Sequence, residues 1–301
     1  MSSSLSSNQL EKLKREIREC SERREQSLNQ LKEWIIKHPF ISNFNMDETI
    51  LLAFIRARKY RMDRVFESID KSSILMKVHN EWFDYKSEKL QRVLDLYDTG
   101  FLKVMKQRDN EGRRILHCNN NLDIEKFNID DIYRLNTMIV NILSLEEETQ
   151  ISGIIYINDY RVNNSMKYFT MFPLKPLSDF IAQLKFIPIR AKKIILLGLP
   201  SYATQFLNIV KKGISEKMSK RIEFMDDTSQ LWNIVDKSTM TKDIDGEANE
   251  REIIEDFRKK IDENIERIQT FLNFNVDLEK AGFFSLEDLE NIGTFRKLQI
   301  D

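Results

Sequence analysis

The side chains that could carry out chemistry in this chain are scattered singly. Its three histidines, His38, His79 and His117, stand far apart, and no cysteine pair has the short spacing of a metal site. The sequence nearest to the Gly-x-Ser-x-Gly turn of serine hydrolases is residues 213–217, which has lysine in place of the second glycine and lies in a helical pattern. Glycine-rich loops of the nucleotide-binding type are also missing. We therefore expect no catalytic residue, no metal site and no cofactor, and predict that the protein is not an enzyme.

Two features could still be catalytic or metal-binding. His117 lies on an apolar segment beside Cys118, a position more typical of a partly buried sheet residue than of a catalytic base. Residues 146–148 are three consecutive glutamates, which are more typical of a solvated helix end than of a metal site. Binding is therefore a better hypothesis than catalysis.

Two short apolar runs are typical of buried strands. They are Ile154–Ile157 and Ile194–Leu197, and a parallel pair of this kind needs a helical crossover, which residues 175–185 could supply. The basic sequence Pro188-Ile-Arg-Ala-Lys-Lys193 comes directly before the second run. From Tyr202 to Ile222, apolar residues recur every four positions beside several lysines, which predicts one long amphipathic helix. A sheet edge, a cationic patch and an apolar helix should therefore lie together.

The order of elements predicts three regions. Helical patterns fill residues 1–88, which we expect to form an all-helical N-terminal module. A hairpin with a turn at Asp109–Gly112 then opens a region of alternating strands and helices, residues 89–272. This alternation predicts an α/β fold with a mixed, mainly parallel sheet flanked by helices. The fold of the tail, residues 273–301, is left open.

Composition limits the possible partners. The 301 residues include 47 basic and 48 acidic side chains, so bulk electrostatics does not indicate a nucleic-acid partner. The first residues lack the apolar core of a signal peptide, and no uncharged run approaches the ~20 residues that span a bilayer. Cys20 and Cys118 are far apart, which favours reduced thiols over a disulfide. We expect a cytoplasmic protein that acts as a monomer.

Several separated stretches resemble the CRAL-TRIO (Sec14-like) family of lipid-binding proteins. Gln150-Ile-Ser-Gly153, followed by a strand that ends at Asp159, is similar to the family's Gln-x-x-Gly strand. Asp109–Arg113 is similar to its first hairpin turn, and Leu51–Tyr60 is similar to the Phe-Leu-Arg-Ala-Arg-Lys-Phe signature of its helical module. The resemblance covers residues 28–272 and is nearest to members of the tocopherol and retinaldehyde carrier type.

The resemblance implies that the α/β region holds one hydrophobic ligand, such as a tocopherol or a retinoid, in a cavity closed by a lid. The cavity residues that it implies are Ile155, Ile157, Phe169, Phe172, Phe180, Leu184, Ile194 and Leu196, and the lid residues are Phe206, Leu207, Val210 and Ile214. Side chains alternate along a strand, so only every second residue can face one cavity, and the sequence does not indicate which. Each residue could instead belong to ordinary core, and the lid could be a permanently packed helix.

Carriers of this type also bind a phosphoinositide headgroup through basic residues from three places in the chain. The matching places here hold Arg56 and Arg58, then Arg190, Lys192 and Lys193, and finally Arg221. Guanidinium and ammonium groups from separate segments can neutralise phosphates together. The resemblance therefore implies a peripheral protein that docks on phosphoinositide-containing membranes. Arg56 could instead pair with an acid of the helical module, and the others could be ordinary surface charge.

The chain departs from the family where the ligand would lie. The family usually has Leu-Pro-x-Glu-x-Gly-Gly after its last helix, whereas residues 239–247 lack the proline and one glycine. The identity of the ligand therefore cannot be taken from any relative. Two other functions stay open. One is a Sec14-type regulator that holds phosphatidylinositol in the cavity, and the other is a ligand-free scaffold that uses the fold for protein contacts.

Overall fold

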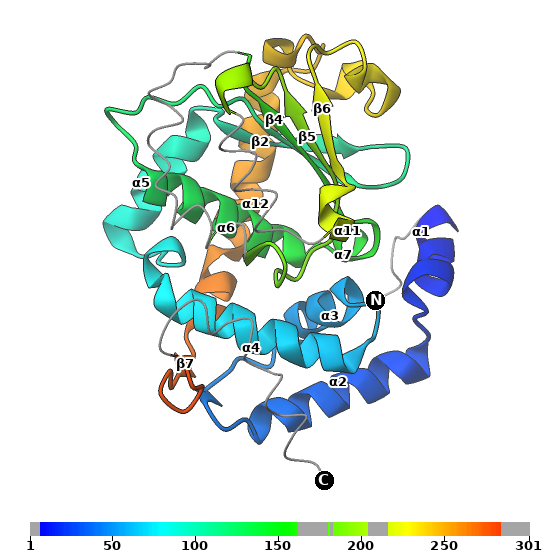
Figure 1. Cartoon of the computed structure of the whole chain (residues 1–301), viewed down its shortest axis with the longest axis vertical. Helices are drawn as coiled ribbons and strands as arrows, with labels where there is room; N and C mark the ends of the chain where they lie inside the picture. The colour runs from blue at the N-terminus through cyan, green and yellow to red at the C-terminus, as the bar shows by residue number, and fades with distance from the viewer. Residues whose placement is uncertain (1–6, 162–179, 181–182, 204–215, 284–301) are drawn as a thin grey trace.

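A five-stranded sheet forms the centre of this molecule (Figure 1). The computed structural model describes residues 7–161, 180, 183–203 and 216–283. The sheet has the order β2-β3-β4-β5-β6, with β2 (Leu102–Arg108), β3 (Arg114–Cys118), β4 (Ile154–Asp159), β5 (Ala191–Leu197) and β6 (Ile222–Met225). Only β2 and β3 are antiparallel, and the other neighbours are parallel. The predicted mixed, mainly parallel sheet flanked by helices is therefore confirmed.

The N-terminal helices gather at one end of the sheet (Figure 1). They are α1 (Ser7–Lys12), the π-helical turn η1 (Leu13–Ile17), α2 (Ser21–Ile36), α3 (Glu48–Ala57), α4 (Met62–Val78) and the 3-10 turn η2 (Asn80–Trp82). Helix α3 begins where the sequence provides a cap, because the Asp47 carboxylate accepts hydrogen bonds from the amides of Thr49 and Ile50.

The other helices of the described residues lie around the sheet. They are α5 (Ser87–Asp98), α6 (Ile129–Ser144), α7 (Glu147–Ser152), α11 (Glu216–Ser219) and α12 (Glu250–Leu272), with 3-10 turns η3 (Ser201–Ala203), η4 (Leu231–Asn233), η5 (Lys237–Thr239) and η6 (Lys242–Ile244). Asn128 and Asp131 form a capping box at the start of α6. Helix α12 packs against both β2 and α6, and it runs behind the sheet in the view of Figure 1.

Alternate residues of the central strands face two separate hydrophobic cores. Ile155 and Ile157 join Ile195 of β5 in a core that residues 231–244 complete on one face of the sheet. Ile154, Ala191 and Leu196 belong to the larger core, which includes residues of α6 and of the N-terminal helices. This division follows from the two-residue repeat of a strand, and it decides which residues can face a ligand.

The tail that the sequence left open is tied to the N-terminal helices. Strand β7 (Asn275–Val276) pairs antiparallel with β1 (Ile41–Ser42), which follows α2. The helical module and the α/β region also share one continuous core, whose buried residues run from Ile17 to Val276 in sequence. Both contacts hold the N-terminal helices against the α/β region.

The long helix predicted for residues 202–222 lies largely outside the described residues. At its described end, α11 stops at Ser219 and Ile222 starts strand β6, where it pairs with Ile194 of β5. The prediction of helix through Ile222 is therefore wrong, because this residue completes the sheet edge. Within the described ranges, no helix is long and apolar enough to cross a bilayer.

Candidate functional site

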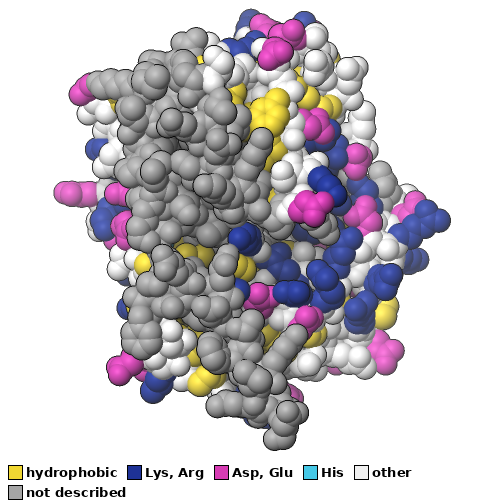
Figure 2. Space-filling model, viewed as in Figure 1, with side chains coloured by type: hydrophobic (Ala, Val, Ile, Leu, Met, Phe, Trp, Pro, Cys, Tyr) yellow, Lys and Arg dark blue, Asp and Glu magenta, His cyan; other side chains and the backbone are white. Residues whose placement is uncertain are grey.

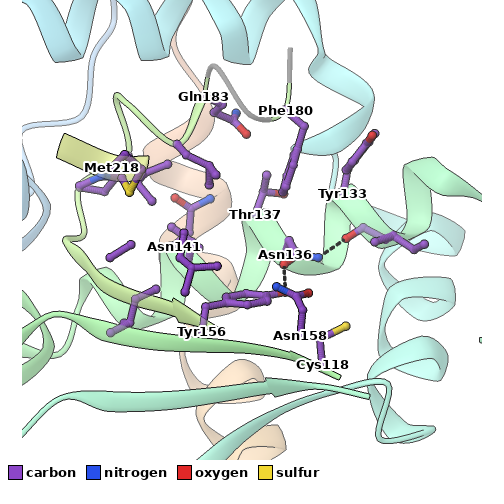
Figure 3. A pocket seen from close by; sticks show the side chains of 18 of the residues that line it. Cys118, Tyr133, Asn136, Thr137, Asn141, Tyr156, Asn158, Phe180, Gln183 and Met218 are labelled. Atoms are coloured by element: carbon purple, nitrogen blue, oxygen red, sulfur yellow. Dashed lines mark hydrogen bonds between the residues drawn. The ribbon is translucent and has the colours of Figure 1, made fainter. Parts of the chain in front are cut away.

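A cavity of about 200 Å³ lies between the sheet and helix α6 (Figure 3). Its floor is the face of β4 and β5 that carries Tyr156, Ile194 and Leu196, and α6 contributes Val140 to its wall. The loop of residues 183–188 closes another side. None of the described residues that line the cavity carries a charged side chain. Such a surface suits an apolar molecule and offers a charged one no counter-ion.

The structure brings part of the predicted cavity set together. Phe180, Leu184, Ile194 and Leu196 line the cavity. The prediction for Ile155 and Ile157 is wrong, because both point to the opposite face of the sheet, where they are fully buried in the second core. The remaining predicted residues, Phe169 and Phe172 of the wall and Phe206, Leu207, Val210 and Ile214 of the lid, lie outside the described residues.

One side of the cavity carries polar groups (Figure 3). The Tyr156 hydroxyl donates to Asn136 Oδ1 at 2.6 Å, and Asn136 Nδ2 donates to the carbonyl oxygen of Ile132 at 2.9 Å. Tyr156 comes from the floor and Asn136 comes from α6, so the pair bridges the sheet and the helix. The pair is satisfied internally, and the Tyr156 oxygen keeps acceptor capacity toward the cavity.

Two side-chain amides near this pair face the cavity. Asn158 occupies the next cavity-facing position of β4, and Gln183 reaches in from the loop (Figure 3). Gln183 is only 4% exposed. In the part of the chain that the structure describes, neither side-chain amide makes a hydrogen bond. Gln183 is buried and Asn158 is half-buried, so a ligand with a polar end could form hydrogen bonds with both amides. The sequence prediction missed these residues, although Tyr156 and Asn158 share one parity in a strand whose other residues are isoleucines and a final aspartate.

Cys118 also lines the cavity. Burial raises the pKa of its thiol to about 12, and its Sγ donates to Asn120 Oδ1 at 3.4 Å. Cys20 and Cys118 are both free, as predicted. The Cys118 thiol is therefore a protonated, unreactive part of the wall at neutral pH.

Arg56 is fully engaged inside the protein. Its guanidinium makes hydrogen bonds to both carboxylate oxygens of Glu19 at 2.7 Å, to Glu147 at 2.9 Å and to Gln150 at 2.7 Å. Burial alone would lower the Arg56 pKa, but the two glutamates outweigh it and raise the pKa. Arg56 therefore pairs with an acid of the helical module, which is the alternative to headgroup binding that the sequence left open.

Arg58 holds the loop that precedes β5. Its Nη2 donates to the carbonyl oxygen of Lys185 at 2.7 Å and to that of Ile187 at 3.3 Å, and its Nε donates to Ser68 Oγ. Burial lowers the pKa of Arg58 to about 10. Arg58 thus positions the cavity loop and presents little charge to solvent.

The structure does bring Arg190, Lys192 and Arg221 together. Charge interactions link Arg190 with Arg221 and with Lys192, and Lys59 with Lys192, so these four residues are called the basic cluster below. Burial lowers the pKa of Arg190, Lys192 and Arg221. Lys and Arg side chains gather on this side of the molecule, between α11 and the N-terminal helices (Figure 2). Lys59 was missed because only the fold brings it here.

Two local features of the chain build the basic cluster. Gly153 has a φ of 81° and lies against the Arg190 carbonyl, where a Cβ atom would collide. The Arg221 guanidinium donates to the carbonyl oxygen of Ala191 at 2.5 Å, which fixes the edge of β6 next to the start of β5. The cluster therefore depends on the Gln-x-x-Gly turn and on the sheet register.

Lys193 does not join the basic cluster. A register shift in the β4–β5 pairing places Lys193 beside Ile155, on the face opposite the cavity. There its ammonium pairs with Glu223 at 2.7 Å. Two neighbouring lysines thus have different surroundings, which the sequence pattern could not reveal.

A second ionic group is buried on the face away from the cavity. Lys103 is fully buried and pairs with Asp243 and with Glu250, the latter at 2.8 Å. His117 is also fully buried, with Asp159 at 3.7 Å, and burial lowers its pKa. The group fastens turn η6 to the sheet, and the sheet separates it from the cavity.

Comparison with known proteins identifies the domain. Residues 98–246 match the family model of the CRAL/TRIO domain. These residues contain the whole sheet, α6 and α7. The predicted resemblance of this part of the chain to the CRAL-TRIO (Sec14-like) family is therefore confirmed.

Individual relatives are distant. A Mus musculus protein named alpha-tocopherol transfer protein-like is 26% identical over 256 residues, which are 82% of this chain and 72% of that protein. Clavesin-1 of Rattus norvegicus is 28% identical over 221 residues, which are 72% of this chain and 62% of that protein. The crystal structure of Sfh5 aligns over 81% of this chain and 98% of that one, with a TM-score of 0.46 and 11% identity.

Proposed function

We propose that the protein carries one uncharged lipid in its cavity and docks on phosphoinositide-containing membranes through the basic cluster. The observation that carries the first part is the apolar cavity between β4, β5 and α6, at one side of which the amides of Asn158 and Gln183 have no hydrogen-bond partner among the described residues. The CRAL/TRIO match and the relatives named alpha-tocopherol transfer protein-like support it. The protein would act in the cytoplasm, peripherally at membranes.

Burial of apolar surface would supply most of the affinity. At ~25 cal/mol per Å², removing ~300 Å² of lipid surface from water contributes about 7.5 kcal/mol, which corresponds to micromolar binding. The cavity of about 200 Å³ is smaller than the ~300–1,000 Å³ typical of ligand sites. A short isoprenoid therefore suits its present volume, and a tocopherol or a retinoid requires the cavity to enlarge.

The chemistry of the wall favours carriage over catalysis. Cys118 and Tyr156 are two lining groups that could act as nucleophile or base, and burial raises the pKa of both. Neither is ionised at neutral pH, so they offer hydrogen bonds to a ligand and no charge.

The same wall disfavours the Sec14-type alternative, in which a phosphatidylinositol lies in the cavity. A phosphodiester needs a cationic or strongly donating partner when it is removed from water. The described lining residues offer amides and hydroxyls but no Lys or Arg. We therefore infer a neutral head such as a hydroxyl or a carbonyl, next to Asn158 and Gln183.

Recognition of a polar head gives a testable preference. We expect the wild-type chain to bind an isoprenoid alcohol about tenfold more tightly than the hydrocarbon of the same chain length, because only the alcohol can form hydrogen bonds with the amides of Asn158 and Gln183. The double variant Asn158→Leu/Gln183→Leu should lose this preference. Competition against a fluorescent fatty alcohol measures both affinities. If the wild type and the double variant preferred the alcohol over the hydrocarbon to the same degree, the proposed site for the polar head would be contradicted.

Membrane docking can be tested with two neighbouring lysines. Each basic group near an anionic surface contributes about 1 kcal/mol, so Lys192→Glu should weaken binding to phosphoinositide vesicles by about 30-fold. Lys193→Glu makes the same charge change on the other face of β5 and should change binding by no more than about twofold. Vesicle sedimentation measures both. Equal effects of the two variants would show that bulk charge, and not the basic cluster, directs the protein to membranes.

A further inference from the structure

An acidic residue from the N-terminal segment forms ion pairs with the basic cluster. Glu16 in turn η1 pairs with Lys192 at 2.8 Å and with Arg190 at 3.5 Å, and the charge of Lys59 also reaches it. Burial would raise the Glu16 pKa, but the hydrogen bond from Lys192 and the three cations outweigh burial and lower the pKa. The basic cluster therefore already holds an anion, supplied by the chain itself.

Arg190 is only partly satisfied by this anion. Its side chain is 7% exposed, and its Nη2 donates to the carbonyl oxygen of Ile151. Its Nε and Nη1 are buried and make no well-formed hydrogen bond to any described residue, since Glu16 approaches Nη1 only to 3.5 Å. A phosphate group offers three strong acceptor oxygens and up to about two negative charges, whereas a carboxylate offers two oxygens and one charge. A phosphate would therefore satisfy Arg190 better than Glu16 does.

The segment that carries Glu16 lies at the edge of the fold and is anchored there by Gln9, Lys12 and Ile17. Helix α1 lies at the margin of the molecule, next to α7 (Figure 1). Ile17 is fully buried, and Lys12 Nζ donates to the carbonyl oxygen of Glu111 at 2.5 Å. Beyond Ile17, Arg18 adopts a left-handed conformation with φ of 62°, which ends the turn. A short segment at the margin of the molecule can open locally at a lower cost in free energy than the central helices and strands.

We propose that residues 7–17 are a displaceable latch, in which the Glu16 carboxylate occupies the place that a phosphate of the membrane headgroup takes when the protein docks. The inference rests on the docking function proposed above and adds its regulation. In the latched state, Glu16 weakens binding to anionic surfaces of low phosphate density. A headgroup that carries several phosphates displaces Glu16 and releases the segment.

The test compares three proteins. Glu16→Gln removes the competing charge, and Glu11→Gln is the control, because Glu11 lies on the same segment and pairs only with exposed Arg15 at 2.7 Å among the described residues. In sedimentation with phosphatidylcholine vesicles that contain phosphatidylinositol bisphosphate, Glu16→Gln should bind about fivefold more tightly than the wild type. Glu11→Gln should bind like the wild type. Without lipid, the amides of residues 7–17 should exchange hydrogen faster in Glu16→Gln than in the other two proteins.

The outcomes separate the latch from the docking function. Vesicle binding by the wild type with no gain in Glu16→Gln, or unchanged exchange of residues 7–17, would overturn the latch and leave the docking proposal standing. Absence of vesicle binding by all three proteins would overturn the docking proposal and, with it, the role of Glu16 as a competitor. Vesicles should accelerate exchange of residues 7–17 in the wild type. The same acceleration by inorganic phosphate alone would overturn the assignment to a lipid headgroup.

Discussion

Lipid that co-purifies with the wild-type protein should be lost when Val140 is replaced by tryptophan. Val140 lies on α6 and lines the cavity, so the indole fills much of the about 200 Å³ that a ligand needs. We expect lipid occupancy to fall by at least about tenfold, because the ligand must then displace a well-packed side chain. Quantitative mass spectrometry of extracted lipid, normalised to protein, measures the effect.

The control for Val140→Trp is Ile36→Trp. Ile36 is 74% exposed on α2, so the same aromatic ring is added where no cavity exists. Both variants should keep their melting temperature within about 5 °C of the wild type, since overpacking at Val140 is offset in part by filling empty space. Retention of wild-type lipid levels by a folded Val140→Trp protein would show that the ligand binds elsewhere.

Replacing Arg56 by methionine should lower the free energy of unfolding much more than replacing an exposed arginine. The side chain is 2% exposed and pairs with Glu19, which is 8% exposed, and with Glu147. Methionine leaves the Glu19 carboxylate buried without its cation, so we expect the free energy of unfolding to fall by about 3–5 kcal/mol. Urea denaturation followed by circular dichroism measures this change.

Arg64→Met provides the comparison for Arg56→Met. Arg64 is 55% exposed on α4 and pairs with Glu67 at 2.8 Å, so its loss should cost no more than about 1 kcal/mol. Nearly equal losses in the two variants would mean that the ionic group around Arg56 does not hold α3 to α7. The buried ion pairs of Arg56 also make this residue unsuited to binding a headgroup.

The sequence predicted the strands and the sheet type well because those signals are local. The apolar runs of β4 and β5, the Gln150–Gly153 turn and the hairpin near Asp109 all appear at their expected places. The start of α3 also coincides with a capping residue in the sequence. Periodicity and turn chemistry act over a few residues, so a single sequence can carry them.

The cavity face could not be predicted in the same way. Strand β4 is aliphatic on both faces, with Ile154 toward the cavity and Ile155 away from it, so hydrophobic alternation is weak. The informative residues were Tyr156 and Asn158, whose polar groups mark the cavity side. In a strand that is buried on both faces, the hydrophobic pattern does not show which alternate residues face which side. The prediction made from aliphatic residues was therefore wrong for Ile155 and Ile157.

The ionic contacts were also beyond prediction from local pattern. Arg56 and Glu19 are 37 positions apart, and Lys192 and Glu16 are 176 positions apart. Each pairing depends on how the N-terminal segment lies across the assembled sheet. Charge alone therefore indicated both Arg56 and Lys192 as headgroup-binding residues, although Arg56 is buried in the interior and Lys192 belongs to the basic cluster.

Mass spectrometry of lipid extracted from the natively purified wild-type protein tests most directly whether the cavity is a lipid site. We expect one class of uncharged lipid with a single polar head, near one molecule per chain, and its absence from Val140→Trp. A phosphatidylinositol in that position would favour the Sec14-type alternative. Lipid no more abundant in the wild type than in Val140→Trp would contradict carriage and favour a ligand-free scaffold.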